Sequence, residues 1–587
     1  MSKIISWFFL VPFSIAIIIS IWNRKAGYVA LAISSAILLA GSFIHFDYLD
    51  SFVVIAALVW IFSSWFSVSY GEKYGRWLAP MFGSTIFGMV IILLSRNYLE
   101  FLAGWEAMSV SSYVLIAMNK KNDYPPFVFM AFSELSTILI IAGAVYSFYL
   151  TGGTTIAFTK VDSVVPLVLF TLGALVKMGM VPFMISEWLP IAHGNAPANG
   201  SAILSATMTL MGVFGIVRLM ILSPISVVFG VIVIAIGVMS VLFASLFAYV
   251  SEHAKMLAGF STIENNGAIL AAIGFYMIAQ TAILRDFSLV VIVIFSLSHS
   301  LSKTGLFLGI GASGKEHLLD EGLRSSRFSR VGEVLSTASL SGLFPTIGGL
   351  GTWMILEMFF MGATFLGYLG IVSIIAGSLI AIGEGFATAA MMKAFVFTQL
   401  RNGKEKGVRN EQSVVFSIGI FLVLLFIISP LFIGTEFLGG LPSIFVFNGF
   451  AIQSRFTSAD FGLISPDYVF GLLAVFSLAT YAVFRKPNTR SVPVWRGGRD
   501  VTENYTPYAF SNNIRLMLKK ILRPGIGERS QYMAIADGFW AFIIIVSTSY
   551  RKMAKGFTLG FMNSSIRWYM IYMILAFMIV LLLTILL

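Results

Sequence analysis

The sequence predicts an all-α, polytopic membrane protein with about 15 or 16 transmembrane helices. Of the 587 residues, 58% are hydrophobic and only 11% are charged, which is too few for the solvated surface of a soluble domain. Mean hydropathy is +0.91, and apolar runs of spanning length recur along the whole chain. Each span needs about 20 apolar residues plus a loop, so this length holds roughly 15 or 16 of them. The pattern excludes a water-soluble fold and a single anchor.

The expected helices follow in order from apolar runs between polar breaks. The first ten lie near residues 4–22, 27–45, 50–70, 78–95, 97–118, 126–150, 164–191, 199–221, 225–250 and 257–279. The others lie near residues 287–311, 331–362, 366–399, 412–435, 467–484 and 566–587.

Two of these runs, 164–191 and 331–362, are expected to be interrupted helices. The first contains Pro182 and Pro190, and the second contains Pro345 before a glycine-rich stretch. Proline removes a helical hydrogen bond and clashes with the preceding turn. Broken backbone at membrane depth is tolerated only where it is buried in protein or lines a cavity.

The interrupted helices hold corresponding places in two five-helix repeats, 78–221 and 225–399. Each is the fourth helix of its repeat, and an odd number of spans inverts the second repeat relative to the first. Paired interrupted helices in inverted repeats indicate an ion or substrate path near the membrane midplane. An N-terminal three-helix segment (1–77) precedes the repeats, and additional spans (400–484) and a C-terminal part (485–587) follow them.

The net charge of +11 is mainly a topology signal. Before the C-terminal tail, alternate loops carry 15 Lys plus Arg, against four in the opposite set. The positive-inside rule therefore places the basic loops in the cytoplasm and the N-terminus outside, in a multi-pass protein of the cell membrane. The chain has no cysteine, which excludes thiolate-bound metals and cysteine-ligated iron–sulfur clusters. We expect no cofactor in this chain.

Ionisable side chains inside spans mark the candidate pathway, because they are costly there and usually functional. Glu106 (in GWEAMSV) and Lys177 (in LVKMGMVPF) could pair, or each could hold or release a proton depending on the other. The bland alternative is a static salt bridge. His299 and Lys303 lie at positions i and i+4 of one helix face, among serines that suit a hydrated path. Lys393 is deep enough that full snorkelling is doubtful.

The other candidates are weaker. Glu134 and Glu264 lie about two turns inside their spans and could be functional or merely interfacial. His193 lies in the loop after the first interrupted helix, where it could admit protons from the cytoplasm or simply be solvated. Lys255 lies next to a span and by itself indicates nothing. Glu357, in the distal half of the second interrupted helix, is a candidate exit carboxylate. The sequence contains no phosphate-binding loop, HExxH or GxSxG motif that would indicate a catalytic site.

These motifs, taken in order, resemble the antiporter-like subunits of respiratory complex I and multisubunit Na⁺/H⁺ antiporters, over residues 78 to 400. GWEAMSVSSYVLI resembles a motif whose glutamate matches Glu106, and LVKMGMVPFMISEWLPIAH one whose lysine and final histidine match Lys177 and His193. Three further stretches resemble motifs of the same family: AKMLAGFSTIENNG, SLSHSLSKTGLFLG and MMKAFVF. The ionisable residues of those motifs match Lys255, then His299 and Lys303, and then Lys393.

The likeness is greatest to the large membrane subunit of group 4 membrane-bound [NiFe] hydrogenases, such as hydrogenase-4, formate hydrogenlyase and archaeal hydrogenase or sulfane reductase complexes. The tail PVWRGGRDVTENYTPYAFSNNIR resembles their post-core motif. The resemblance implies a lateral helix, near residues 530–562, in which Asp537 would contact a neighbour, and then a terminal anchor. Two positions depart from the family pattern: Thr352 and Phe295 stand where it has ionisable residues.

The resemblance implies a proton- or sodium-translocating subunit of a complex I-like redox complex. Protons would enter near His193 and Lys255, pass Lys177 and Lys303, and leave by way of Lys393. Iron–sulfur clusters, and a nickel–iron site in a hydrogenase, would belong to partner subunits. One alternative is an Mrp-type Na⁺/H⁺ antiporter subunit without redox partners. Another is a membrane enzyme acting on lipid-linked substrates, which the largest loops, 436–466 and 485–530, do not favour.

Overall fold

The computed structural model describes most of the chain up to residue 518 and only isolated positions beyond it. The described residues are 8–44, 46–119, 123–182, 188–314, 316–318, 322–324, 326–400, 403–405, 409–433, 445–448, 451–456, 459–484, 507–518, 548–549, 552, 555 and 571. Residues 1–517 form one compact unit and residues 518–587 form a second. The predicted lateral helix near 530–562, the Asp537 contact and the anchor at 566–587 lie outside the described residues, apart from a few isolated positions.

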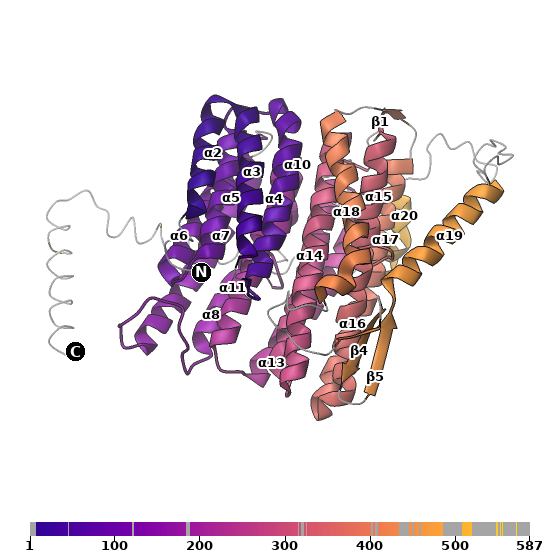
Figure 1. Cartoon of the computed structure of the whole chain (residues 1–587). Helices are drawn as coiled ribbons and strands as arrows, with labels where there is room; N and C mark the ends of the chain where they lie inside the picture. The colour runs from indigo at the N-terminus through magenta and orange to yellow at the C-terminus, as the bar shows by residue number, and fades with distance from the viewer. Residues whose placement is uncertain are drawn as a thin grey trace. The chain divides into compact units, whose positions relative to one another are not determined.

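The compact unit is a bundle of helices that run side by side (Figure 1). Ten helices in the described ranges are long and apolar enough to cross a membrane, and three shorter apolar helices accompany them. The all-α polytopic fold class is thereby confirmed. The first elements are α2 (Leu10–Trp22), α3 (Arg24–Ser42), α4 (Asp50–Tyr70) and the short turn η1 (Gly71–Lys73).

The first predicted repeat contains five helices, the fourth of them interrupted. They are α5 (Leu78–Leu94), α6 (Tyr98–Ala117), α7 (Tyr124–Leu150), α8 (Val165–Lys177) with α9 (Trp188–Asn195), and α10 (Ala198–Ile203) continued by the π-helical η3 (Leu204–Met208) and α11 (Thr209–Leu222).

The second predicted repeat has the same order. Its helices are α12 (Val227–Val250), α13 (Ala254–Ile278), α14 (Ala282–Ser313), α15 (Arg327–Leu340) with α16 (Ile347–Phe365), and then the turn η4 (Gly367–Leu369) before α17 (Gly370–Phe395), which the π-helical η5 (Val396–Leu400) continues. The later helices are α18 (Arg409–Ile433), α19 (Pro466–Phe484) and α20 (Pro507–Met517).

Both interrupted helices break in the same way. In α8 the left-handed Gly179 (φ 66°) follows the end of the first half, and its amide bonds Val176 O while the Met180 amide bonds Leu175 O. The left-handed Gly342 (φ 64°) likewise follows the end of α15. The bonds there run from the Gly342 amide to Ser339 O and from the Leu343 amide to Ala338 O. Each first half therefore ends in a Schellman motif, which satisfies carbonyls that the break would leave unpaired.

Glycine seams join the first two helices of each repeat. A Cβ on Gly104 of α6 would lie 2.7 Å from Gly88 O of α5. A Cβ on Gly267 of α13 would likewise lie 2.7 Å from Gly237 O of α12. Such contact of two backbones is the usual packing device of membrane helices, where burial of apolar surface gives little driving force.

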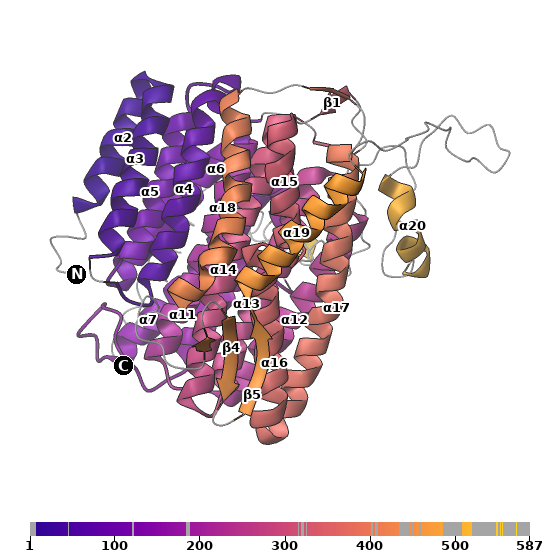
Figure 2. The same cartoon turned by 45° about the vertical axis from the view of Figure 1, so that its right-hand side comes forward.

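The described residues also form two small β-sheets outside the helices. The segment that the sequence treats as the loop 436–466 contains an antiparallel meander of β3 (Phe445–Asn448), β4 (Ala451–Phe456) and β5 (Ala459–Ile464), shown near α16 in Figure 2. A short parallel pair, β1 (Gly322–Arg324) and β2 (Gly403–Glu405), joins two of the predicted cytoplasmic loops. The oblique helix α19 beside the meander is apolar and almost fully exposed.

Candidate ion pathway

The basic loops meet at one end of the bundle, here named the basic end. Arg24 donates to the Tyr74 carbonyl, Lys73 pairs with Glu411 at 3.0 Å, and Lys255 pairs with Glu316 at 3.0 Å. The sequence assigns this end to the cytoplasm. Because these loops are tied together by polar contacts, the charge asymmetry of the sequence corresponds to one face of the folded chain.

Lys177, the last residue of α8, is fully buried at the first helix break. Its Nζ donates to Ser109 Oγ of α6 at 2.6 Å and to Ser133 Oγ of α7 at 2.9 Å. The ring centroids of Trp105 and Phe129 lie 5.5 and 5.2 Å from the same nitrogen. Two hydroxyls and two aromatic rings thus surround an amine in which a proton can be held or released.

Glu106 acts on Lys177 across hydroxyl groups, and the structure shows no direct ion pair between them in the described residues. The Glu106 carboxylate accepts a hydrogen bond from Thr137 Oγ1, which also donates to the Ser133 carbonyl at 3.1 Å. Glu106 and Glu134 are both within electrostatic range of the Lys177 ammonium. The side chain of Glu134 lies on the exposed side of α7. The alternative, a static salt bridge between Lys177 and Glu106, is therefore not favoured.

Lys303 and His299 are buried on α14, as their spacing suggested. Lys303 Nζ donates to the Ala258 carbonyl of α13 at 3.0 Å. His299 faces the backbone of Ser205 in the π-helical turn η3. Irregular π-turns in helices often occur at functional sites.

His193 lies between the two repeats. Its buried ring is within electrostatic range of both Lys303 and Lys255, and it packs 5.1 Å from the ring of Phe307. Neither ring nitrogen has a hydrogen-bond partner among the described residues. A buried polar group of this kind normally bonds water. His193 is thus placed to connect the basic end with Lys303.

Lys255, at the basic end, is held on both sides. Its Nζ donates to the Ala196 carbonyl at 3.0 Å and to Glu316 Oε1 at 3.0 Å. Lys255 therefore joins the end of the first interrupted helix to the loop after α14.

Lys393 is also near the basic end, not near the opposite end where an exit would open. Its Nζ donates to the carbonyls of Ser251 (2.6 Å) and Tyr249, where α12 ends. Arg515 of α20 donates to the neighbouring Val250 carbonyl, and the two cations together cap α12. The tail motif was noted in the sequence, but this contact could not be predicted from it.

Two buried carboxyl groups were missed in the sequence. Glu384 of α17 is 8% exposed and lies within electrostatic range of Glu264, which is 1% exposed on α13. Glu333 of α15 is 4% exposed and accepts from Ser329 Oγ at 2.8 Å. Glu384 stands alone in an apolar run, so the rule that selected Glu264 applies to it as well, whereas Glu333 lies in a polar stretch after Arg330.

Glu357 has a different setting from the exit carboxylate that the sequence proposed. Its Oε1 accepts a 2.6 Å hydrogen bond from the Gly462 amide in β5. A Cβ on Gly462 would lie 2.8 Å from the same carboxylate. This contact favours a role in fixing the meander to α16.

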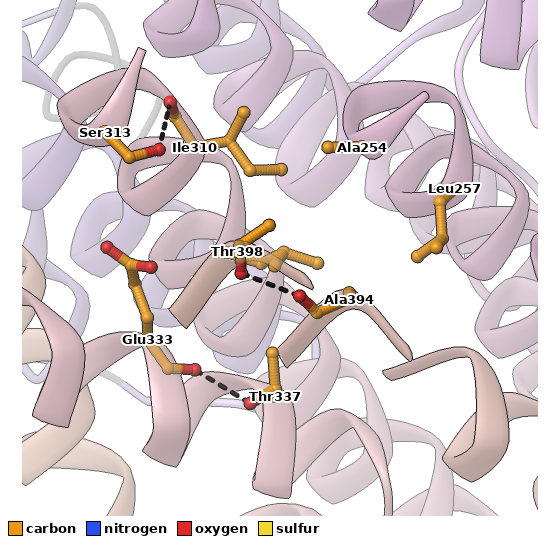
Figure 3. Close-up of a pocket in the computed structure, with 9 residues that line it drawn as sticks. Ala254, Leu257, Ile310, Ser313, Glu333, Thr337, Ala394 and Thr398 are labelled. Carbon is orange, nitrogen blue, oxygen red and sulfur yellow. Dashed lines mark hydrogen bonds between the residues drawn. The ribbon is translucent and has the colours of Figure 1, made fainter. Parts of the chain in front are cut away.

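A small cavity opens between α13, α14, α15 and α17 near the basic end (Figure 3). Its polar lining is Glu333, Thr337, Ser313 and Thr398. Leu306, one turn from Lys303 on α14, forms part of its wall. The cavity has room for about one water molecule, and a water needs polar partners of this kind.

A comparison with known families identifies the core. Residues 95–376 match the family described as "NADH:quinone oxidoreductase/Mrp antiporter, TM". The core of this chain, nearly half of its length, is therefore similar to that family. The match includes each residue of the predicted pathway except Lys393. In the described residues no group of three or more His, Cys, Asp or Glu could hold a metal ion.

Individual relatives agree with this assignment. The chain is 31% identical to hydrogenase-4 component B of Escherichia coli over 293 residues, 46% of this chain and 43% of that protein. It is 30% identical to a Staphylococcus aureus protein named as antiporter subunit mnhA2, over 51% of this chain and 39% of that one. The alignments thus span about two fifths of these relatives.

A solved structure shares the whole fold. A chain of the membrane-bound sulfane sulfur reductase, an archaeal respiratory membrane complex, superposes with a TM-score of 0.79 over 98% of this chain and 99% of that one. Its sequence identity is 17%, so the likeness is one of fold.

Proposed function

We propose that this antiporter-like chain moves protons across the cell membrane as a subunit of a complex I-like, hydrogenase-related complex. Electron transfer in partner subunits drives the movement. The observation that carries the proposal is the set of buried ionisable groups inside the bundle, of which Lys177 lies at a helix break and His299 faces a π-turn. Such groups are too costly to retain in a membrane interior for packing alone.

Protons enter at the basic end. His193 and Lys255 stand there, and the cavity lined by Glu333 and Thr337 is a second opening toward Lys303. Both routes reach the same region of α14. The hydroxyl pair Ser205–Thr262, 2.6 Å apart, lies on the route between the repeats.

Coupling acts through Glu106. A change of charge or position near this carboxylate, caused by a reduced or oxidised partner, alters how firmly Lys177 holds its proton. Moving one charge against 100 mV requires about 2.3 kcal/mol. This corresponds to a change in proton affinity of about fiftyfold, which a shift in one nearby charge can supply in a low dielectric.

Replacing Lys177 with Met tests the proposal. The variant should assemble and transfer electrons but should no longer acidify sealed vesicles during turnover, because the amine that takes the proton is gone. Lys160→Met, an exposed lysine in the loop before α8, is the matched control and should pump normally. Normal acidification by Lys177→Met would contradict the proposed path.

A second candidate function is Na⁺/H⁺ exchange without redox partners, which the likeness to the antiporter subunit of Staphylococcus aureus favours. The purified native complex distinguishes the two. Iron–sulfur clusters, with nickel in a hydrogenase-like complex, indicate redox partners. A complex of membrane subunits without these metals indicates an exchanger.

A further inference from the structure

We propose that Glu333 takes up protons at the basic end for the second repeat and passes them along the contact between α15 and α14 to Lys303; this inference rests on the proposed function. Glu333 lies on α15, about two turns before that helix ends, and its side chain is 4% exposed. It supplies the carboxyl group of the small cavity between α13, α14, α15 and α17.

The position of this carboxyl is fixed by α14 and by its own helix. A Cβ on Gly309 of α14 would lie 2.5 Å from Glu333 Cγ and 3.3 Å from its Oε1. Ser329 Oγ donates to the same Oε1 at 2.8 Å. A side chain at position 309 would therefore occupy the space that the carboxyl group fills, and the glycine lets Glu333 reach α14.

The hydroxyl protons in the lining of the cavity are already engaged. Figure 3 shows three hydroxyls that each donate to a backbone carbonyl of the preceding turn: Ser313 Oγ at 3.0 Å, Thr337 Oγ1 at 2.9 Å and Thr398 Oγ1 at 2.7 Å. Their remaining lone pairs and the carboxyl of Glu333 can only accept, so the molecule that fits beside them is a donor. The cavity has room for about one water molecule, and a water or a hydronium ion meets this need.

The cavity lies where protons from the basic end can reach it. Its wall includes Ala254, the first residue of α13, and Ser313, the last residue of α14. Lys255 stands at the other entrance, and its ammonium donates to the Ala196 carbonyl and to a carboxylate. An ammonium has no lone pair. Of these two groups, Glu333 is therefore the one that can accept a proton.

The contact between α15 and α14 carries buried hydroxyls inward from the cavity. Ser336 and Ser339 lie three and six residues after Glu333, on the same face of α15. Ser336 Oγ fits against Gly305 of α14, where a Cβ would lie 2.0 Å from it, and Ser302 Oγ of α14 donates to Ser339 Oγ at 2.7 Å. Three residues of a helix rise about 4.5 Å, a distance that one bridging water spans. The route thus ends beside the buried lysine that follows Ser302.

Proton transfer along this route balances without another reactant. A hydronium ion at the basic end gives its proton to the ionised carboxylate of Glu333 and leaves as water. The carboxylic acid then gives a proton to the route, in which each water or hydroxyl accepts one proton and passes one on. The amine of Lys303, neutral after releasing its previous proton, accepts the last one. The carboxylate of Glu333 is restored and Lys303 is again an ammonium.

Pumping by the assembled complex in sealed vesicles tests the uptake role. Glu333→Gln keeps the acceptor for Ser329 but cannot bind a proton, so it should lose most of its proton yield per electron. Glu333→Asp keeps the charge and should retain part of the yield, which a purely structural role would not predict. Glu411→Gln is the matched control and should pump normally, because Glu411 is also buried but bonds Lys73.

Infrared titration of the purified complex separates a failure of this inference from a failure of the proposed function. The difference between wild type and Glu333→Gln should contain one C=O band of a protonated carboxyl, which grows on acidification and shifts in D₂O. Absence of that band at every pH at which the complex is intact would overturn the uptake role, whether or not the complex moves protons. Normal pumping by Glu333→Gln, with loss in Lys177→Met, would overturn it and leave the proposed function standing.

Discussion

At the scale of single residues, the buried lysines Lys177 and Lys393 differ in the kind of group that they bond. Lys177 bonds hydroxyls, which can both donate and accept protons. Lys393 bonds two backbone carbonyls, which can only accept. This difference favours the proposed transport role for Lys177 and a packing role for Lys393.

This distinction predicts the effect of removing Lys393. Lys393→Met leaves carbonyls at the end of α12 unpaired, which should destabilise the chain by about 1–3 kcal/mol. The proton yield per electron of the assembled complex should stay near that of the wild type. Thermal unfolding and pumping, measured on the same preparation, check this. A Lys393→Met variant that is as stable as the wild type but does not pump would contradict this prediction and indicate that Lys393 takes part in proton transfer.

Most residues of the candidate site could be selected from the sequence, for a physical reason. A charge in an apolar run stands out, and that contrast marked Glu106, Lys177, His299 and Lys303. The same contrast was present for Glu384, which was overlooked. The partners of Lys255 and Lys393 depend on packing between distant helices. No local pattern encodes such contacts.

At the scale of elements, backbone contact between helices fixes the repeats. Gly237 of α12 is so close to α13 that a Cβ would lie 2.6 Å from Gly267 O. Proline predicted both helix breaks, and apolar runs predicted the helices. The meander β3–β5 was missed, because its short strands lack a long hydrophobic alternation and form only through their mutual pairing.

The glycine seam gives a prediction with an internal control. Gly237→Ala forces α12 and α13 apart and should lower stability by about 1–3 kcal/mol, the usual cost of overpacking. Gly385→Ala on α17 meets no atom within 4 Å and should be neutral or slightly stabilising. Thermal unfolding of the two variants measures the difference. Equal stability would show that the seam is looser than described.

At the scale of the whole molecule, the proposed direction of transport requires the basic end to face the cytoplasm. The chain has no cysteine, so one introduced thiol reports one position. A membrane-impermeant maleimide should label Lys160→Cys in intact cells, while Lys25→Cys should react only after the membrane is opened. Both lysines are exposed, Lys25 at the start of α3 and Lys160 in the loop before α8. The reverse pattern would invert the direction of transport proposed here.

The most direct test of the central claim is redox-driven pH change in sealed vesicles that contain the wild-type complex, measured in a sodium-free medium. Electron donor should cause acidification that a protonophore collapses and a sodium ionophore leaves intact. An absence of any pH change without sodium, or a pH change that needs no electron donor, would contradict a redox-driven proton path through this chain.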